Sequence, residues 1–529
     1  MLDLPALCRW LAAEVGLDYY DIDPLEIDVP AVTAVMSYAY AQRFGVLPVK
    51  VTAEEIVVAT AEPFRTEWTR EIERISARRV RLVISDPESI RRYQVEFYNL
   101  ARSVRQARDQ HEGQASPLQN LEQLMELGRK GALDANSQHV VSIVDWLLQY
   151  AFDQRASDIH LEPRRELGHV RFRIDGVLHK VYELPAAVMT AVTSRLKILG
   201  RMDVAEKRRP QDGRIKTRDK RGQEVELRLS TMPTAFGEKL VMRIFDPEVV
   251  ARDFEALGFS RQDSEKWQQM IRRPHGIILV TGPTGSGKTT TLYASLKMLA
   301  TEAVNVCTVE DPIENIEPAF NQMQVQHNIG LDFATGVRTL LRQDPDIIMI
   351  GEIRDLETAQ MAVQASLTGH LVLSTLHTND ATSAVTRLME IGVAPYLIRA
   401  TLLGVMAQRL VRTLCPQCKR PAPLDEDAWT SLVSPFKSAV PKTACEAVGC
   451  LDCRQTGFRG RIGLYEIFTL SDTLKSMIRA DMDLAQFRRQ AMKEGMLPLR
   501  LSGAQKVGAG LTTVAEVLKV APPIEGAVD

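Results

Sequence analysis

The sequence predicts a multidomain α/β protein, on three observations. Its 529 residues are enough for three or four domains, each able to bury its own core. Short apolar segments typical of strands alternate with segments of helical periodicity. The composition, 45% hydrophobic and 25% charged, is that of ordinary globular protein. The 65 basic and 67 acidic residues leave a net charge of −2, so no bulk positive field attracts nucleic acid, and we expect no nucleic-acid partner.

The N-terminus, Met1-Leu2-Asp3-Leu4-Pro5, lacks the cationic start and apolar centre of a signal peptide. No apolar segment approaches the roughly 20 residues needed to cross a bilayer. We therefore expect a cytoplasmic protein without a transmembrane segment, whose contact with any membrane depends on a partner.

Residues 1–100 are predicted to form a small α/β domain. Helical spacing covers 4–15, and three short strands are expected at 46–49, 56–59 and 80–84. No residue in this domain points to chemistry. The following segment, 101–138, is polar and charged, and we interpret it as a hinge-like linker.

Residues 139–250 form a second predicted α/β domain, rich in arginines on strands and turns. Arg214 follows Gln211-Asp212-Gly213, and Arg228 lies within the strand 225–230. Such arginines are most often surface ion-pair partners. As a group they could instead supply positive charge to a nucleotide bound by an adjacent subunit.

The third predicted domain, 251–410, contains the pattern G-x-x-x-x-G-K-[ST] between an apolar strand and a helix. In such a loop several backbone N–H groups and the helix N-terminus point at a phosphate. Lys288 is expected to reach the β- and γ-phosphates of ATP, and the Thr289 hydroxyl to bind Mg²⁺. The alternative is a glycine-rich turn with an incidental lysine. The expected nucleotide-binding residues are Gly282, Pro283, Thr284, Gly285, Ser286, Gly287, Lys288, Thr289 and Thr290.

A second apolar strand, 347–350, ends in Gly351-Glu352. A carboxylate at the end of a buried strand in this domain is the best candidate for the base that activates water; the alternative is a solvated glutamate. Many P-loop enzymes keep a magnesium-binding Asp just before this position, where this chain has Gly351. Magnesium would then depend on Thr289, the phosphates, water, and Glu310 or Asp311.

Two histidines flank the apolar strand 371–373. His377 lies just past the strand, where loops of such sheets face ligand, and we expect it near the γ-phosphate. We give His370 the same role. A purely structural role is the ordinary alternative for either histidine.

Two C-x-x-C pairs, Cys415/Cys418 and Cys450/Cys453, are separated by 31 residues. Such pairs can present four thiolates to a structural Zn²⁺, with a small subdomain inserted between them. Redox pairs or cysteines without metal are the alternatives, and Cys445 is interpreted as a spectator. We assign 411–458 to this subdomain and 459–529 to C-terminal helices.

From residue 157 to about 520 the chain resembles the bacterial type II secretion and type IV pilus assembly ATPases. Residues 282–289 resemble the family's Walker A, 308–314 its acidic box, and 341–355 an atypical Walker B ending in Gly-Glu. Residues 368–379 resemble its histidine box. The four cysteines match the metal-binding insert of the secretion and pilus-extension branches. Arg214 and Arg228 best match the family's arginines that complete the nucleotide site.

The resemblance implies a homohexamer of RecA-like P-loop ATPase cores, each preceded by a PAS-like α/β domain. It also implies ATP hydrolysis that drives the addition of pilin-like subunits to a filament. Some members carry an Arg-Leu-Gly-x-x-Leu repeat that binds cyclic di-GMP. Residues 1–100 lack it, so we expect this domain to dock on inner-membrane platform proteins.

Within this family we favour protein secretion, with extension of a type IV pilus as the alternative. A protein of another class, a nucleotide-dependent scaffold that does not hydrolyse ATP, also fits the phosphate-binding loop. A DNA-translocating motor is a third candidate, which the near-neutral net charge disfavours.

Overall fold

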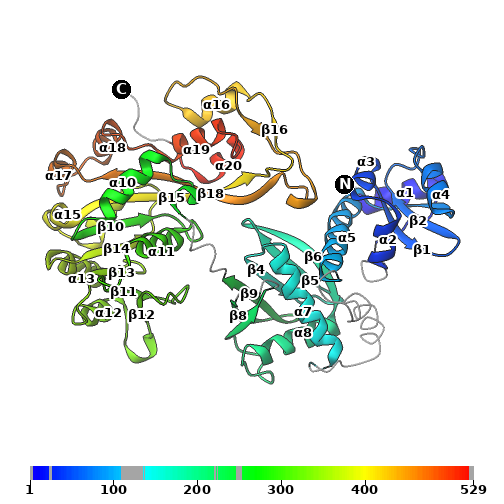
Figure 1. Ribbon diagram of the computed structural model, residues 1–529, viewed down its shortest axis with the longest axis horizontal. Coiled ribbons are helices and arrows are strands. Elements are labelled where there is room, and N and C mark those ends of the chain that lie inside the picture. The colour runs from blue at the N-terminus through cyan, green and yellow to red at the C-terminus, as the bar shows by residue number, and fades with distance from the viewer. Residues whose placement is uncertain are drawn as a thin grey trace. The chain divides into compact units, whose positions relative to one another are not determined.

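The computed structural model describes residues 4–22, 27–108, 135, 137–219, 222, 224–245 and 253–523. The chain divides into two compact units, Met1–Phe245 and Asp246–Asp529. Each is described by itself (Figure 1). The division lies close to the boundary predicted at residue 250, and the finer domain boundaries remain predictions.

The first unit begins with a three-stranded sheet of order β1-β2-β3. The first two strands are antiparallel and the last two parallel. Helix α5 continues to Arg108, into the segment predicted to be a linker; most of the rest of that segment lies outside the described residues. The elements are α1 Leu4–Val15, α2 Val29–Val35, α3 Tyr38–Phe44, β1 Val46–Val51, β2 Glu55–Thr60, α4 Thr69–Ser76, β3 Arg79–Ile84 and α5 Pro87–Arg108.

A six-stranded antiparallel sheet follows, in the order β6-β5-β4-β9-β8-β7. Its strands alternate buried and more exposed residues, so one face is apolar. That face packs with helices α7 and α8 in one core, to which Ile159, Phe172 and Leu227 belong. The elements are α7 Gln138–Asp153, β4 Asp158–Glu162, β5 Leu167–Ile174, β6 Val177–Pro185, α8 Ala186–Leu199, β7 Gln211–Arg218, β8 Glu224–Thr234 and β9 Gly237–Phe245.

The second unit is built on a seven-stranded sheet of order β12-β11-β13-β14-β10-β15-β18. Six of these strands pair in parallel, and β18 pairs antiparallel with β15. Strands β10, β13 and β14 are buried throughout, because helices cover both faces of a parallel sheet. Their carboxyl ends meet at one edge, which positions the site. The strands are β10 Gly276–Thr281, β11 Val306–Glu310, β12 Asn321–Gln324, β13 Ile347–Ile350, β14 Leu371–Leu376, β15 Leu402–Leu414 and β18 Phe458–Thr469.

The C-terminal region departs from the sequence prediction of helices alone. Its first residues form β18, which extends the core sheet alongside β15. One face of β18 packs in one core through Leu464 and Phe468, and the other in a second core through Tyr465 and Ile467. A strand buried on both faces has no polar alternation, so it does not give the usual signature of a strand.

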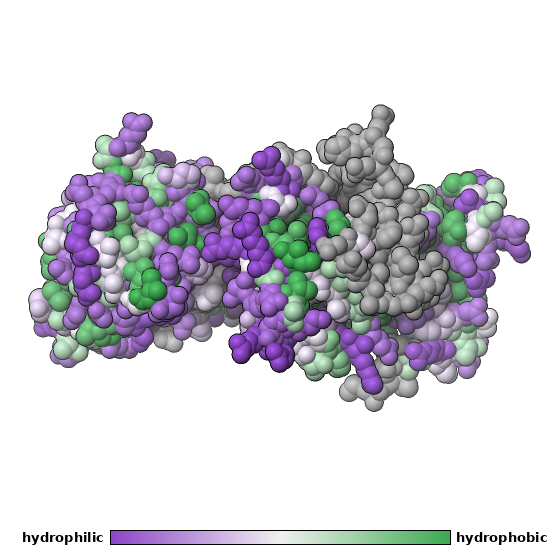
Figure 2. All heavy atoms as spheres, turned by 90° about the horizontal axis from the view of Figure 1, so that it is seen from below, coloured by the Kyte–Doolittle hydropathy of each residue, from purple (hydrophilic) through white to green (hydrophobic). Residues whose placement is uncertain are grey.

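Helices complete the second unit, with two short strands in the segment between the cysteine pairs. No helix among the described residues is long and apolar enough to cross a membrane. The face in Figure 2 is mainly hydrophilic, with scattered hydrophobic patches. The elements are α9 Phe254–Leu257, α10 Arg261–Ile271, α11 Lys288–Leu299, η2 His327–Ile329, α12 Phe333–Leu340, α13 Leu356–Leu367, α14 Ser383–Ile391, α15 Pro395–Thr401, β16 Arg420–Pro421, α16 Glu426–Val433, β17 Cys445–Glu446, η3 Leu451–Cys453, α17 Asp472–Met477, α18 Leu484–Lys493, α19 Leu499–Gly508 and α20 Val514–Val520.

Candidate nucleotide site and metal centre

The phosphate loop connects β10 to α11, as the sequence predicts. Gly282 and Gly287 have φ angles of 152° and 85°, values that favour glycine. A Cβ on Gly282 would lie 2.5 Å from the carbonyl oxygen of Gln408, and one on Gly287 2.8 Å from its Nε2. Gly287 caps α11, so the N-terminus of that helix opens onto the loop. The loop therefore lies so close to β15 that no side chain fits at Gly282 or Gly287.

Two side chains of the loop suit a bound phosphate. Lys288 Nζ donates to the carbonyl oxygens of Gly282 and Pro283, at 2.8 and 3.1 Å. Burial and the charge of Arg409 lower the pKa of Lys288, whereas Glu352 raises it. Ser286 is 2% exposed, and its Oγ has no hydrogen-bond partner among the described residues. A buried hydroxyl and an ammonium group over the loop fit phosphate oxygens.

Glu352 and His377 lie at the ends of two neighbouring strands, β13 and β14. Thr375 Oγ1 donates to the carbonyl oxygen of Gly351 at 2.8 Å and so ties the two strand ends together. Glu352 Oε1 pairs with Arg354 at 2.5 Å, and Oε2 lies 3.3 Å from His377 Nε2. Oε2 is buried and has no aligned hydrogen-bond donor among the described residues. The structure thus brings together Glu352 and His377, the candidate base and the candidate γ-phosphate histidine chosen from the sequence.

The two acidic candidates for magnesium binding differ in accessibility. Glu310 is buried and accepts hydrogen bonds from Tyr293 at 2.7 Å, Thr308 at 2.6 Å and Gln322 at 3.2 Å. Both of its carboxylate oxygens are therefore engaged by protein donors. Asp311 is exposed, with His327 Nε2 3.2 Å from its Oδ2. The geometry favours Asp311 over Glu310 as an open oxygen ligand.

The placement of His370 beside the phosphate is contradicted by the sheet. His370 precedes β14, and its carbonyl oxygen accepts from the N–H of Gly276, at the start of β10. Its Nδ1 lies 2.9 Å from the carbonyl oxygen of Ala365. The phosphate loop is at the other end of the parallel strands, roughly 20 Å away for strands of this length. The two histidines that flank one strand therefore face opposite edges of the sheet.

Arg409 is a site residue that the sequence prediction missed. It follows the apolar part of β15 and is only 5% exposed. Its Nη1 donates to the carbonyl oxygen of Gln408 at 3.0 Å, and its Nη2 to that of Asn379 at 2.7 Å. A Cβ on Gly282 would lie 2.9 Å from Nη1. Arg409 lies within β15 rather than after a strand, so the signal that selected Glu352 does not apply to it. The pairing of β15 with β10 brings Arg409 beside the phosphate loop.

The predicted arginines of the first unit are neighbours across the six-stranded sheet. Arg214 lies directly opposite Arg228, which lies opposite Arg243. Asp158 and then Arg173 continue the same line. Asp158 binds Arg243 at 3.1 Å and lies 3.7 Å from Arg173. We call these four arginines the arginine row; it lies on the face away from the α7–α8 core, because its residues alternate with the core residues of their strands.

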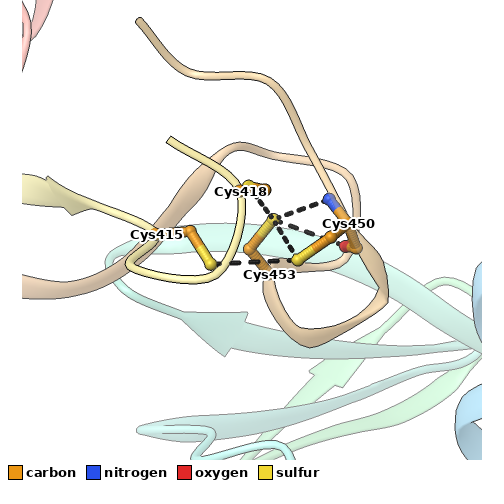
Figure 3. A group of neighbouring side chains, drawn as sticks. All are labelled: Cys415, Cys418, Cys450 and Cys453. Carbon is orange, nitrogen blue, oxygen red and sulfur yellow. Dashed lines mark hydrogen bonds between the residues drawn. The ribbon is translucent and has the colours of Figure 1, made fainter. Parts of the chain in front are cut away.

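The four predicted cysteine ligands converge on one point (Figure 3). Their sulfurs all lie within 4.8 Å of one another, and three pairs are 3.7, 3.8 and 3.9 Å apart. A tetrahedral zinc with Zn–S of about 2.3 Å requires S···S of about 3.8 Å. Backbone N–H groups of Gly449, Cys450 and Gly457 donate to the sulfurs of Cys418 and Cys453. This set can hold a metal ion and fits zinc; Cys445 is not part of it.

The segment between the cysteine pairs does not depend on a core of its own. Trp429, Leu432 and Val433 of α16 belong to the same core as Ala504 of α19 and Val517 of α20. Helix α16 thus packs on the C-terminal helices, and the metal cluster holds only the two turns at its base.

These observations define the class of protein. A parallel sheet that carries a phosphate loop, a strand-end glutamate and a facing histidine is typical of P-loop ATPases, and this chain is one. Comparison with known proteins gives the family. Residues 134–519 match the model of the type II/IV secretion system proteins, and the chain belongs to that family. Residues 15–104 match the model of the MshEN domain.

Relatives in this family carry two kinds of names. The chain is 55% identical to the type IV pilus assembly ATPase TfpB of Acinetobacter baylyi, over 98% of this chain and 89% of the relative. It is 48% identical to the type II secretion system protein E of Pseudomonas aeruginosa, over 72% of this chain and 75% of the relative. The fold resembles the ATPase DotB of Legionella pneumophila, with a TM-score of 0.54, 21% identity, and coverage of 72% of this chain and 95% of DotB.

Proposed function

We propose that this ATPase powers the assembly of a type IV pilus. The supporting observation is the extent of the similarity. The relative named a pilus assembly ATPase matches along 98% of the chain, whereas the type II secretion relative matches along 72%. The similarity to the pilus assembly relative therefore extends over nearly the whole chain, which is why we favour it. This reverses the preference for secretion drawn from the sequence, and powering protein secretion becomes the second candidate.

Hydrolysis would be carried out by the residues at the carboxyl ends of the strands. The phosphate loop binds the β- and γ-phosphates of ATP through its N–H groups, Lys288 and the Ser286 hydroxyl. Thr289 and Asp311 would hold Mg²⁺, which neutralises charge on the phosphates. Glu352 orients the attacking water or takes its proton, and His377, 3.3 Å from it, faces the γ-phosphate. Each role is a proposal from the position of the side chain.

The arginine row suits a nucleotide bound by a neighbouring subunit of a homohexamer. Like charges directly opposite on a sheet repel. Among the described residues, Asp158 and Glu226 each lie within ion-pair distance of two of the four arginines. Such a concentration of guanidinium groups is stabilised when it meets phosphate. Arg243 and Arg173 therefore join Arg214 and Arg228 as candidates.

The N-terminal domain would link the ATPase to the machine. We propose that the MshEN-like domain docks on cytoplasmic inner-membrane platform proteins, so that the enzyme acts at the inner face of that membrane. The cysteine cluster would hold a structural zinc, since it offers four sulfurs and lies apart from the phosphate loop in sequence.

Complementation in the source bacterium tests the proposed function. Deletion of the gene should abolish surface pili, and the wild-type gene should restore them while a Lys288→Ala allele does not. Secreted protein levels are measured in the same strains. Loss of secretion with normal piliation would favour the second candidate. Steady-state phosphate release by the purified protein separates a motor from a scaffold.

A further inference from the structure

The loop that carries His377 is held on one side by the nucleotide site. Its Thr378 N–H donates to Thr281 Oγ1, at the end of β10, at 2.8 Å. The carbonyl oxygen of Asn379 accepts from Arg409 Nη2 at 2.7 Å. These contacts connect the loop to the residues that border the phosphate loop.

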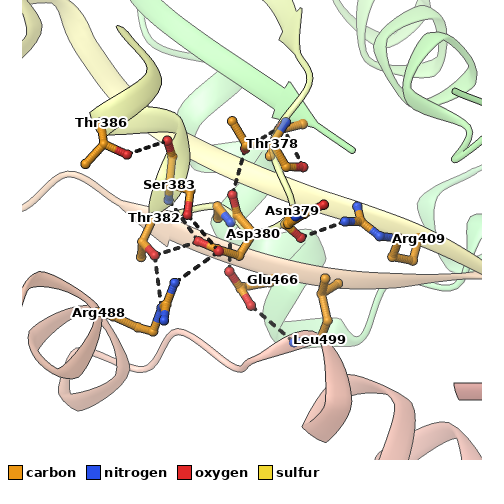
Figure 4. Close-up of polar contacts among 12 residues, drawn as sticks. Thr378, Asn379, Asp380, Thr382, Ser383, Thr386, Arg409, Glu466, Arg488 and Leu499 are labelled. Atoms are coloured by element: carbon orange, nitrogen blue, oxygen red, sulfur yellow. Dashed lines mark hydrogen bonds and ion pairs between the residues drawn. The ribbon is translucent and has the colours of Figure 1, made fainter. Parts of the chain in front are cut away.

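The same loop is held on its other side by the C-terminal region (Figure 4). Glu466 of β18 accepts from the N–H of Ala381 at 2.8 Å and from the N–H of Leu499, at the start of α19, at 3.2 Å. Arg488 of α18 binds Asp380 at 3.0 Å and contacts Thr382 Oγ1 at 3.3 Å. The two acidic groups thus join the loop to three C-terminal elements.

Asp380, Glu466, Arg409 and Arg488 form one charge network, in which Glu466 and Arg409 are buried and Asp380 and Arg488 are partly buried. Glu466 and Arg409 are each 5% exposed. The charges of Glu466 and Asp380 oppose the effect of burial, which lowers the pKa of Arg409. Asp380 also accepts from Ser383 N and Thr382 Oγ1, at 2.8 and 2.7 Å, so its position is fixed. Arg488 and Asp380 form an ion pair, and removing Arg488 leaves the partly buried Asp380 without this partner.

Packing alone does not fix residues 377–380 of this loop. A cavity of about 850 Å³ lies between the loop residues 377–380 and the C-terminal residues Leu484, Met496 and Pro498. A loop that borders a space of this size has few van der Waals contacts on that side. Ala381, by contrast, is buried in the core of the second unit. The position of residues 377–380 therefore depends on this anchor and on the polar contacts of Asp380.

We propose that Arg488 and Glu466 are positioning residues through which the C-terminal helices set the place of His377 beside Glu352. Arg488 acts through Asp380, and Glu466 acts through the N–H of Ala381. A partner that moves α18 or α19 would then change hydrolysis without contacting the nucleotide. This inference rests on the proposed role of His377 at the γ-phosphate.

The test compares Arg488→Ala, Arg488→Lys and Glu466→Gln in the full-length assembled protein. Lys475→Ala is the control, because it removes an exposed ion pair with Asp472 in the same helical region. In Arg488→Ala we expect kcat to fall at least tenfold while the ADP dissociation constant stays within threefold of wild type. Backbone N–H groups of residues 377–382 should exchange with deuterium faster, with no change in 276–289. Arg488→Lys should recover part of kcat.

Unchanged kcat and unchanged exchange in folded Arg488→Ala would overturn the proposal. So would equal losses of kcat and ADP affinity with faster exchange throughout the second unit, which indicate a general loss of folding. If Arg488→Ala does not fold, kcat and hydrogen exchange are measured instead on Thr382→Val and Arg488→Lys, and the same criteria then test the proposal. His377→Ala is measured in parallel: wild-type kcat there refutes the proposed role of His377, whereas the exchange result tests the network independently.

Discussion

His377 Nε2 lies 3.3 Å from Glu352 Oε2 although the two residues are 25 positions apart. The parallel pairing of β13 with β14, in which Ile350 lies opposite Ser374, brings them together. The other oxygen of Glu352 is held by Arg354. Glu352 thus lies between the guanidinium of Arg354 and the imidazole of His377. Its Oε2 has no aligned donor among the described residues, so it is the candidate atom to accept a proton from water.

Lys288→Ala should abolish ATP turnover without unfolding the protein. Among the described residues, the hydrogen bonds of Lys288 Nζ go to carbonyl oxygens of its own loop, and Lys288 is not part of the hydrophobic cores of the second unit. Phosphate release and circular dichroism of the purified variant check this. Turnover near the wild-type rate would remove Lys288 from the mechanism.

Glu352→Gln should keep ATP binding while hydrolysis slows by roughly 10²–10⁴-fold, the usual contribution of a positioned base. The amide has the shape of the carboxylate but cannot take a proton. Binding of a fluorescent ATP analogue and single-turnover hydrolysis separate the two steps. A loss of binding as large as the loss of hydrolysis would instead assign Glu352 to magnesium or to structure.

Arg228→Ala should lower kcat by at least roughly tenfold, since arginines supplied to a phosphoryl-transfer site contribute more than this in other P-loop enzymes. Arg218→Ala is the matched control, because Arg218 is on the neighbouring strand but outside the arginine row. Mixing Arg228→Ala with Lys288→Ala chains tests action between subunits: mixed hexamers should regain activity only where an intact row meets an intact loop. No recovery at any mixing ratio would oppose the proposal.

Cys415→Ser should reduce bound zinc from about one per chain toward zero and weaken assembly. The serine oxygen is a poor replacement for a thiolate in a four-sulfur site. Nucleotide binding should persist, because the phosphate loop does not include the cysteines. The segment between the cysteine pairs should also stay in place, since α16 packs on the C-terminal helices. Elemental analysis of protein purified without chelator decides: zinc near zero in the wild type, with four titratable thiols, would refute the site.

Glu466→Gln should change how stability depends on pH. Burial raises the pKa of Glu466 to about 7, whereas an unfolded glutamate titrates near 4.5. A raised folded pKa stabilises the fold below the unfolded value, and this stabilisation is lost as pH rises from about 4.5 to 7. The glutamine variant lacks this pH-dependent contribution to stability, because an amide does not ionise in this range. The difference in thermal midpoint between the variant and the wild type should therefore be more positive at pH 8 than at pH 5. An equal difference at both pH values would contradict the raised pKa of Glu466.

Several parts of the fold and site could be predicted from local sequence. The phosphate loop is one, because backbone geometry restricts residues 282–289 to few patterns. The four cysteines are another, because turns of fixed length present sulfur pairs to a metal. Glu352 and His377 followed from the rule that loops after parallel strands share one edge. The same rule, applied with the strand direction, would have excluded His370.

The strand β18 and the role of Arg409 could not be predicted in this way. β18 is buried on both faces over residues 463–468, because these lie between two cores, and even the charged Glu466 among them is buried. Its pairing with β15 joins residues 44 to 65 positions apart. Arg409 can be recognised as a neighbour of the phosphate loop only when β15 is known to pair with β10.

By itself, the sequence determined the features that short motifs encode: a phosphate loop, a strand-end carboxylate as candidate base, and four cysteines that can hold a metal ion. Only the tertiary structure decided which charges meet. The arginine row depends on the register of five strands, and the network of Asp380, Glu466, Arg409 and Arg488 on the packing of the C-terminal helices. The physical reason is that motifs are fixed by backbone geometry over a few residues. Charge pairs across a fold are fixed by strand register and packing between segments far apart in the chain.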